Sequence, residues 1–179
     1  MNKINVIDLD KTLIPFDSFR YLLLAYLKDK NFLTIVSLYV FAREIRLVKS
    51  EAFKRQCLIH LRKDKQYQKM INDLLGKIIS ATRHEIMNMI NSETDQETIN
   101  VLVSASPIDY VGLVAMELGW QWLASDLVNG QFIHCHGQKK KELVLLHYPS
   151  EKFEYNFAIS DSVSDLPLLE MFKRHKLII

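Results

Sequence analysis

The chain has 179 residues and a formal net charge of +2, with 49% hydrophobic and 25% charged residues. This length suits one domain, or one domain with a modest insertion, and the composition is ordinary for a globular protein. The small net charge gives no reason to expect a nucleic-acid partner, and only 5 Gly and 4 Pro argue against disorder and against a turn-rich all-β fold.

The cysteines and the most apolar stretch bear on where the protein works. Cys57 and Cys135 form neither a CxxC pair nor a disulfide framework, so we expect a reducing compartment, the cytoplasm. We expect no signal peptide at the N-terminus. Residues 19–42 are strongly apolar, but the segment 28–30 divides them into halves shorter than the roughly 20 residues of a spanning helix. A pair of buried amphipathic helices is expected there, and an apolar surface that meets lipid is the alternative.

Apolar periodicity predicts alternating strands and helices, with one long helical block after the first strand. Strands are predicted at 3–9, 98–106, 120–125, 153–160 and 176–179, and helices within 17–92 and at 107–119, 139–148 and 164–175. The pair Asn129-Gly130 between apolar segments predicts a hairpin. The alternation predicts an α/β fold: a Rossmann-like parallel sheet with helices on both faces and an inserted all-helical subdomain.

Polar side chains follow the ends of several predicted strands. Asp8 and Asp10 end the first strand, Ser104 ends the second, and Asp161 ends a later one. A cluster of three lysines, residues 139–141, begins a helix. Because ligands bind outside the carboxyl ends of parallel strands, we expect these groups to converge at one edge of the sheet.

The chemistry of such a cluster is that of phosphoryl transfer. Crowded carboxylates need a compensating charge, and oxygen ligands suit Mg²⁺, which takes one or two carboxylates together with waters and phosphate oxygens. A carboxylate also serves as a covalent nucleophile, and a second one as general acid and base. Lysine and serine stabilise the negative charge that develops on the phosphoryl oxygens.

Four segments resemble, in order, the four motifs of the haloacid dehalogenase superfamily of phosphohydrolases. They are "DLDKTL" from Asp8, "VSAS" ending at Ser106, a lysine after "HG", and "SDSVSD" ending at Asp165. The chain is most similar to the phosphoserine-phosphatase-like branch, whose members carry a helical cap between the first and second motifs. The resemblance implies a catalytic core at 1–16 and 93–179 and a helical cap at 17–92.

The resemblance also implies roles for single residues of the first two motifs. Asp8 is expected to be the nucleophile, and Asp10 the general acid and base. Both are expected to bind Mg²⁺, Asp10 through its backbone carbonyl. Thr12 is expected to orient the aspartate and to belong to the phosphate-binding set, and Ser104 to donate a hydrogen bond to a phosphate oxygen.

The later motifs are expected to complete the site. Asp161 is implied as a Mg²⁺ ligand and Asp165 as a supporting residue of the metal site. The spacing Gly-x-x-Lys from Gly137 points to Lys140 as the phosphate-binding lysine, although its two lysine neighbours flank it. Ser160 departs from the pattern, because this branch commonly has Gly there.

Several of these residues also have structural interpretations. Asp8 and Asp10 suit a turn with a helix cap, and Ser106 is expected to cap the helix that follows Pro107. If the segment "HCHG" is a strand, His134 and His136 lie on one face of it, which suggests a zinc site. A zinc site needs about four ligands, and the sequence shows no second pair, so the edge of a hairpin is the favoured interpretation.

The sequence thus predicts a Mg²⁺-dependent phosphatase that forms an aspartyl-phosphate and acts on a small anionic phosphomonoester. A sugar phosphate is the favoured substrate class. The alternatives are a phosphatase of a lipid-linked phosphate at a membrane surface, with membrane contact not favoured, and a non-catalytic binding module. Basic residues of the helical block suit an anionic substrate: Arg43, Arg46, Lys49, Lys54, Arg55 and Arg62.

Overall fold

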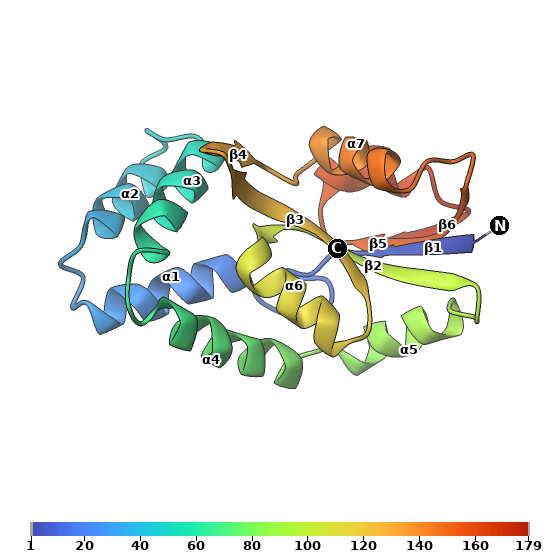
Figure 1. Ribbon diagram of the computed structural model, residues 1–179, viewed down its shortest axis with the longest axis horizontal. Coiled ribbons are helices and arrows are strands. Elements are labelled where there is room, and N and C mark those ends of the chain that lie inside the picture. The colour runs from blue at the N-terminus through green and yellow to red at the C-terminus, as the bar shows by residue number, and fades with distance from the viewer. Residues whose placement is uncertain (1, 179) are drawn as a thin grey trace.

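A six-stranded sheet forms the centre of the protein, and β1 lies between β2 and β5 (Figure 1). The computed structural model describes residues 2–178. The strand order is β4-β3-β2-β1-β5-β6, and only β4 runs antiparallel to its neighbour. The strands are β1 Asn2–Ile7, β2 Thr98–Pro107, β3 Gln121–Val128, β4 Gln131–Ile133, β5 Phe153–Ser160 and β6 Arg174–Leu177.

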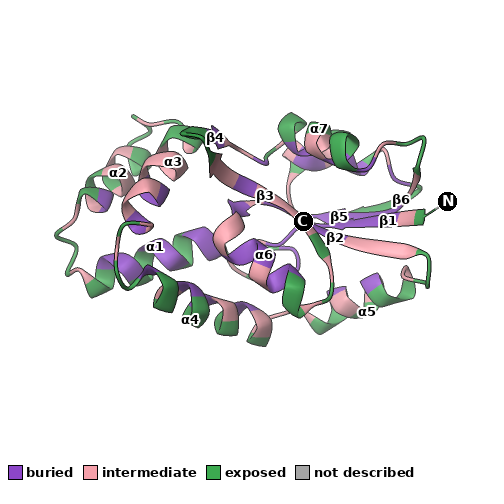
Figure 2. Ribbon diagram, in the orientation of Figure 1, coloured by how far each residue is buried: buried purple, intermediate pink, exposed green. Residues whose placement is uncertain are grey.

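Helices cover both faces of the sheet because the strand residues alternate in direction. Ile7 and Leu102 belong to one buried cluster with α5 and α6, whereas Val6 and Val101 belong to a second cluster with α7 and α8. The buried residues therefore line the sheet on both sides (Figure 2). These helices are α5 His84–Ser92, α6 Ile108–Glu117, α7 Gln138–His147 and α8 Leu166–Leu169, the last preceded by the 3₁₀ turn η1 Val163–Asp165.

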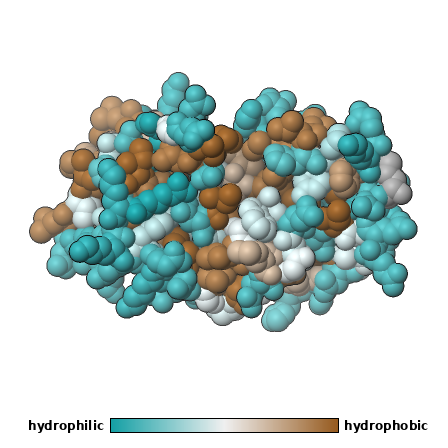
Figure 3. Space-filling view, in the orientation of Figure 1, coloured by the Kyte–Doolittle hydropathy of each residue, from teal (hydrophilic) through white to brown (hydrophobic). Residues whose placement is uncertain are grey.

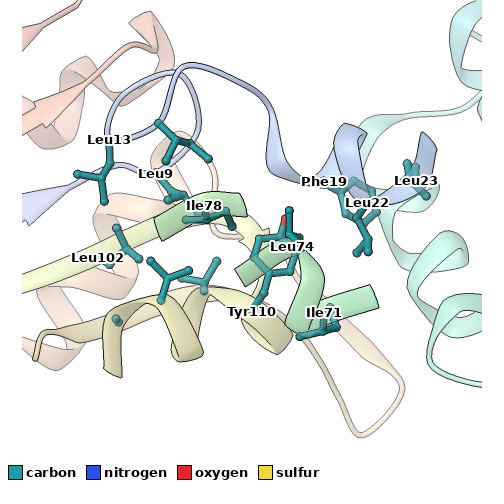
Figure 4. Packing of buried hydrophobic residues seen from close by; sticks show 14 of the residues in the cluster. Leu9, Leu13, Phe19, Leu22, Leu23, Ile71, Leu74, Ile78, Leu102 and Tyr110 are labelled. Carbon is teal, nitrogen blue, oxygen red and sulfur yellow. The ribbon is translucent and has the colours of Figure 1, made fainter. Parts of the chain in front are cut away.

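Five helices lie between β1 and β2 in the chain, and the first three extend away from the sheet (Figure 1). α4 packs against both α1 and α6. The buried side chains Leu22, Ile71 and Tyr110 join these three helices in one apolar cluster (Figure 4). The first four helices of the block are α1 Ser18–Asp29, α2 Ile35–Glu44, α3 Ser50–Leu61 and α4 Tyr67–Ser80.

The predicted fold class is confirmed, and so is the hairpin. β3 and β4 pair antiparallel, and Asn129 and Gly130 both have positive φ at the turn. The long final helix predicted at 164–175 is wrong: only η1 and the four-residue α8 are helical. Arg174 already pairs with Phe157 of β5, so tertiary strand pairing overrides the local helical pattern. Ile179, the end of the predicted last strand, lies outside the described residues.

The apolar stretch 19–42 is divided between α1 and α2, as the charged break predicted. Among residues 2–178, no helix combines the length and the hydropathy needed to cross a membrane.

Both edges of the sheet are short. β4 has three residues and β6 has four, and the β6 sequence is RHKL with its first three side chains exposed. The edge strands therefore offer few unpaired backbone groups.

Three asparagines from β1, β2 and β5 form a hydrogen-bonded row across one face of the sheet. The fully buried Asn5 Nδ2 donates to Asn100 Oδ1 at 2.9 Å, and Asn156 Nδ2 donates to Asn5 Oδ1 at 2.9 Å. Asn5 and Asn156 also donate to the carbonyl of Glu93, just after α5. The row therefore satisfies buried polar groups and attaches the end of α5 to the sheet.

Replacing the central asparagine tests the importance of this row. We expect Asn5→Ala to lower the free energy of unfolding by about 2–3 kcal/mol, because it leaves buried partners without hydrogen bonds. Chemical denaturation measures this change. Asn2→Ala, at the exposed start of the same strand, is the matched control and should change stability little; equal effects of the two variants would contradict the role of the row.

Candidate active site

Asp8 follows the central strand and lies at the carboxyl edge of the sheet. Its backbone N–H donates to the Ile159 carbonyl of β5. Its Oδ1 accepts a hydrogen bond from Lys140 Nζ at 2.7 Å, and its Oδ2 accepts one from Thr12 Oγ1 at 3.1 Å. Burial raises the pKa of Asp8 to about 6, although the Lys140 ammonium lowers it. The carboxylate is therefore fixed in orientation and predominantly ionised at neutral pH.

Lys140 is buried between two carboxylates. Its Nζ contacts Asp8 and also Asp165 Oδ2, both at 2.7 Å. Burial lowers the pKa of Lys140, but the charges of Asp8 and Asp165 together raise it above its usual value. The neighbouring Lys139 instead pairs with Glu142 at the surface. Gly137, with φ of 54°, directly precedes α7 and allows the turn that brings Lys140 into the site.

Ser160, which departs from the family pattern, contributes to this cluster. Its Oγ donates to Asp165 Oδ2 at 2.7 Å, and the N–H of Ser162 donates to the same hydroxyl. Asp165 thus accepts two hydrogen bonds through one oxygen and holds the Lys140 ammonium in place.

Thr12 connects the first and last motifs. It is fully buried; its hydroxyl donates to Asp8 and accepts the N–H of Asp161 at 2.8 Å. Thr12 does not line the cavity beside Asp8. Its position is that of a residue that orients Asp8, and its place in the phosphate-binding set stays a prediction.

Asp10 lies among hydroxyl groups. Its Oδ1 accepts the Ser18 N–H at 2.6 Å and its Oδ2 accepts the Ser106 hydroxyl, while Ser18 Oγ contacts Tyr110 Oη at 2.9 Å. The expectation that Ser106 caps α6 is wrong: Pro107 is the N-cap residue, and the Ser106 side chain points to Asp10 instead. Burial raises the pKa of Asp10, which these hydrogen bonds partly offset.

A cavity of about 250 Å³ opens beside these residues. Ser104, Asp161 and Asp165 also line it, so the structure brings the predicted site residues together, with Thr12 behind Asp8 and outside the cavity lining. Asp161 makes no side-chain hydrogen bond or ion pair with any described residue. Five aspartates and three lysines are among the lining residues: Asp8, Asp10, Lys11, Asp17, Lys54, Ser104, Ala105, Cys135, His136, Lys140, Asp161, Ser162 and Asp165.

Helix α3 closes one side of the cavity. Lys54 Nζ donates to the Ala105 carbonyl at 2.8 Å, just beyond Ser104. At the other end of α3, Arg62 donates to Asp109 of α6 at 2.7 Å and to Asp126 of β3 at 3.0 Å. The sequence indicated a basic helical block but not which cation enters the site, because helical periodicity does not say which surface face meets the sheet.

The "HCHG" segment follows β4 as a loop that leads to α7, so the strand expected for these histidines is not formed. His134 and His136 lie on one side and stack with their ring centroids 5.2 Å apart. In the part of the chain that the structure describes, no three His, Cys, Asp or Glu side chains are grouped closely enough to hold a metal by themselves. His134 Nε2 is buried without a hydrogen-bond partner among residues 2–178. A zinc site therefore has no support in this segment.

A parallel sheet whose central strand ends in an ion-paired carboxylate, beside a polar cavity, is the arrangement of an α/β enzyme. The chain belongs to the haloacid dehalogenase-like hydrolase family, since the family profile matches residues 6–170. The predicted family is thereby confirmed. No curated protein has a significant sequence match to the chain.

Solved structures share the fold at low sequence identity. A protein with unknown function from Bordetella pertussis Tohama I has a TM-score of 0.74 at 17% identity, over 98% of this chain and 89% of that one. A HAD family hydrolase from Salmonella enterica serovar Typhi has a TM-score of 0.66 at 12% identity, over 96% of this chain and 60% of that one. A substrate-bound phosphoserine phosphatase has a TM-score of 0.59 at 12% identity, over 98% and 85%. At these identities the likeness establishes the fold.

His134 makes stability depend on pH. Burial, together with the charge of Lys54, lowers its pKa to about 4. The unfolded chain, with a histidine pKa of about 6.5, binds the additional proton first, so stability falls as pH drops from about 6.5 towards 4. We expect His134→Gln to remove about 1 kcal/mol of the loss between pH 7 and pH 5, given partial exposure to solvent.

Urea denaturation at the two pH values measures this difference. The exposed His84 of α5 is the matched control, and His84→Gln should follow the wild-type pH dependence. A His134→Gln protein that loses as much stability as the wild type would contradict the assignment.

Proposed function

We propose that the protein is a Mg²⁺-dependent phosphomonoester hydrolase that acts through an aspartyl-phosphate on Asp8. One observation carries the proposal: the Asp8 carboxylate is held by Lys140 and Thr12 at the wall of a cavity that Asp10, Ser104 and Asp161 also line. An ionised and oriented carboxylate is what a nucleophile requires. Family membership supports the hydrolase class.

In the first step, an Asp8 oxygen attacks the phosphorus and the bond from phosphorus to the leaving alcohol breaks. Asp10 donates its proton to the alcohol oxygen. Burial raises the pKa of Asp10, which is the direction of change that suits a general acid. The Ser104 hydroxyl and the Lys140 ammonium stabilise the negative charge on the phosphoryl oxygens.

In the second step, the aspartyl-phosphate is hydrolysed. Asp10, now ionised, takes a proton from water, and the water oxygen attacks the phosphorus. The bond between phosphorus and Asp8 then breaks, which releases inorganic phosphate and restores the Asp8 carboxylate. The same carboxyl group thus serves as acid and then as base.

The donor set fits Mg²⁺. Asp161 has a carboxylate free of partners among the described residues, and aspartates outnumber lysines at the cavity. Two carboxylates, of Asp8 and Asp161, with the Asp10 backbone carbonyl, waters and substrate oxygens match the preference of Mg²⁺ for oxygen ligands. When bound, Mg²⁺ would neutralise charge between the substrate phosphate and these carboxylates.

The helical block is proposed as the cap that selects the leaving group. The predicted division, core 1–16 and 93–179 with cap 17–92, stays a prediction. The attachment of the end of α5 to the asparagine row favours a cap that ends before α5. A small anionic phosphomonoester remains the proposed substrate, and a cytoplasmic location is proposed because Cys57 and Cys135 are buried free thiols.

Removing the nucleophile tests the reaction. We expect Asp8→Asn to abolish phosphate release from a phosphomonoester panel of phosphoserine, sugar phosphates, nucleotides and a polyprenyl phosphate, and EDTA to abolish it in the wild type. Asp73→Asn, on the exposed face of α4, is the matched control and should keep wild-type activity. An Asp8→Asn protein with the wild-type rate would refute the nucleophile, and inactivity of a folded wild type across the panel would favour a non-catalytic module.

A second candidate function, a phosphatase of lipid-linked phosphates at a membrane surface, is favoured by one further observation. Exposed apolar side chains gather over and beside α2, at the left of the view in Figure 3, and include Leu33, Leu38, Phe41 and Leu47. The basic Arg43 is also exposed on α2. An apolar surface next to a cation suits an anionic membrane.

Flotation with vesicles tests this membrane contact. We expect the protein to float with vesicles that contain phosphatidylglycerol, and the double variant Leu38→Glu/Phe41→Glu to lose at least half of that binding. Leu146→Glu replaces an equally exposed leucine of α7 and should leave flotation unchanged. A wild-type protein that stays wholly in the soluble fraction would exclude the membrane candidate.

A further inference from the structure

A second cavity, of about 260 Å³, lies inside the helical block between α1, α2 and α3. We call it the α1–α3 cavity. Asp17 and Lys54 line both this cavity and the one beside Asp8, so the two cavities meet at these residues. The α1–α3 cavity therefore adjoins the place where the leaving group of a phosphate at Asp8 would extend, with Asp17 and Lys54 at the boundary.

Apolar side chains form one part of the wall of the α1–α3 cavity, and the rest of the lining is polar or charged: Asp17, Arg20, Arg43, Glu44, Ser50 and Lys54. Phe19, Leu23 and Leu27 of α1, Val40 of α2 and Phe53 of α3 line it. These side chains offer no hydrogen bonds to the hydroxyl groups of a sugar, and a hydroxyl buried without a partner costs free energy. This apolar part of the wall favours an apolar group over the sugar of the sugar phosphate expected from the sequence.

Charged side chains lie where the apolar wall ends. Lys54 stands between the two cavities, with its Nζ 5.7 Å from the Phe19 ring centre. Arg20, Arg43 and the acidic Glu44 are exposed lining residues of the same cavity. The arrangement matches a ligand with a phosphate at one end and an apolar portion behind it.

The size of the cavity limits the ligand further. A cavity of about 150 Å³ holds a benzene molecule, so the α1–α3 cavity has room for an apolar group larger than one ring. We propose that the substrate is a phosphomonoester of an alcohol with an apolar chain, and that this chain occupies the α1–α3 cavity. This inference rests on the proposed phosphatase function.

A phosphate joined to an apolar chain occurs both in free alkyl phosphates and in the phosphates of membrane lipids. The first measurement is kcat/KM for n-alkyl phosphates from ethyl to octyl, below their micelle-forming concentrations. We expect kcat/KM to rise about fourfold for each buried methylene until the cavity is full. A parallel assay offers a polyprenyl phosphate in phosphatidylcholine vesicles. A higher kcat/KM in the vesicles than for octyl phosphate assigns the chain to a lipid, and the reverse assigns it to a free alkyl phosphate.

Two cavity variants and one control test the location of the chain. We expect Val40→Phe, which fills the cavity, and Leu24→Glu, at its half-exposed lining, each to lower kcat/KM for octyl phosphate at least tenfold and to leave that for ethyl phosphate unchanged. Leu38→Glu changes an exposed α2 leucine outside the cavity and should alter neither. Equal losses on both substrates, or no rise with chain length, would overturn the inference.

Binding measurements on a variant without the nucleophile test this inference independently of the proposed hydrolysis. Calorimetric titration of the Asp8→Asn variant with ethyl and octyl phosphate measures the preference without turnover. Tighter binding of octyl phosphate, lost in the Val40→Phe background, supports the cavity assignment even where no phosphate is released. Chain-independent binding overturns it, whereas hydrolysis that persists in Asp8→Asn refutes only the nucleophile.

Discussion

The ion pair of Lys140 with Asp8 and Asp165 is the interaction on which the site depends. Two carboxylates with little exposure to solvent would be strongly destabilised as charges without a buried ammonium between them. The pair also joins three parts of the chain, because it connects the end of β1 to the first turn of α7 and to η1. The orientation of the Asp8 carboxylate is thus a property of the core and does not depend on a bound ligand.

The helical block is attached to this core through the opposite edge of the cavity. α3 reaches the β2–α6 connection through Lys54, and α6 and β3 through Arg62. Both anchors carry charge, and both lie on the α6 side of Asp8. The site therefore combines a fixed set of reacting groups with a wall contributed by a separate layer of helices, and the chemistry of that wall decides which leaving group fits.

The sequence predicted the sheet and most of the cluster because both follow from local patterns. Strand ends at Asp8, Ser104 and Asp161 must meet at one edge of a parallel sheet, and the Gly-x-x-Lys spacing indicated the lysine that the structure places beside Asp8. The contacts of Asp10 were not predictable in this way, since its carboxylate accepts from the Ser18 N–H at the start of α1 and from the Ser106 hydroxyl, 96 positions away. The prediction of a long final helix was wrong for a related reason. Pairing with β5, which no local sequence pattern indicates, determines the conformation of Arg174 and the residues after it.

The short edges of the sheet also bear on how the protein behaves at high concentration. Unpaired edge strands are templates for the association of sheets from different molecules, and positive side chains oppose such association. β6 presents Arg174 and Lys176, both exposed, so two β6 edges brought together would place like charges side by side. At the other edge, three residues of β4 provide too few backbone groups for a stable intermolecular ladder. The exposed leucines near α2 are therefore a greater hazard for aggregation than the sheet itself, and charge at that surface would govern solubility.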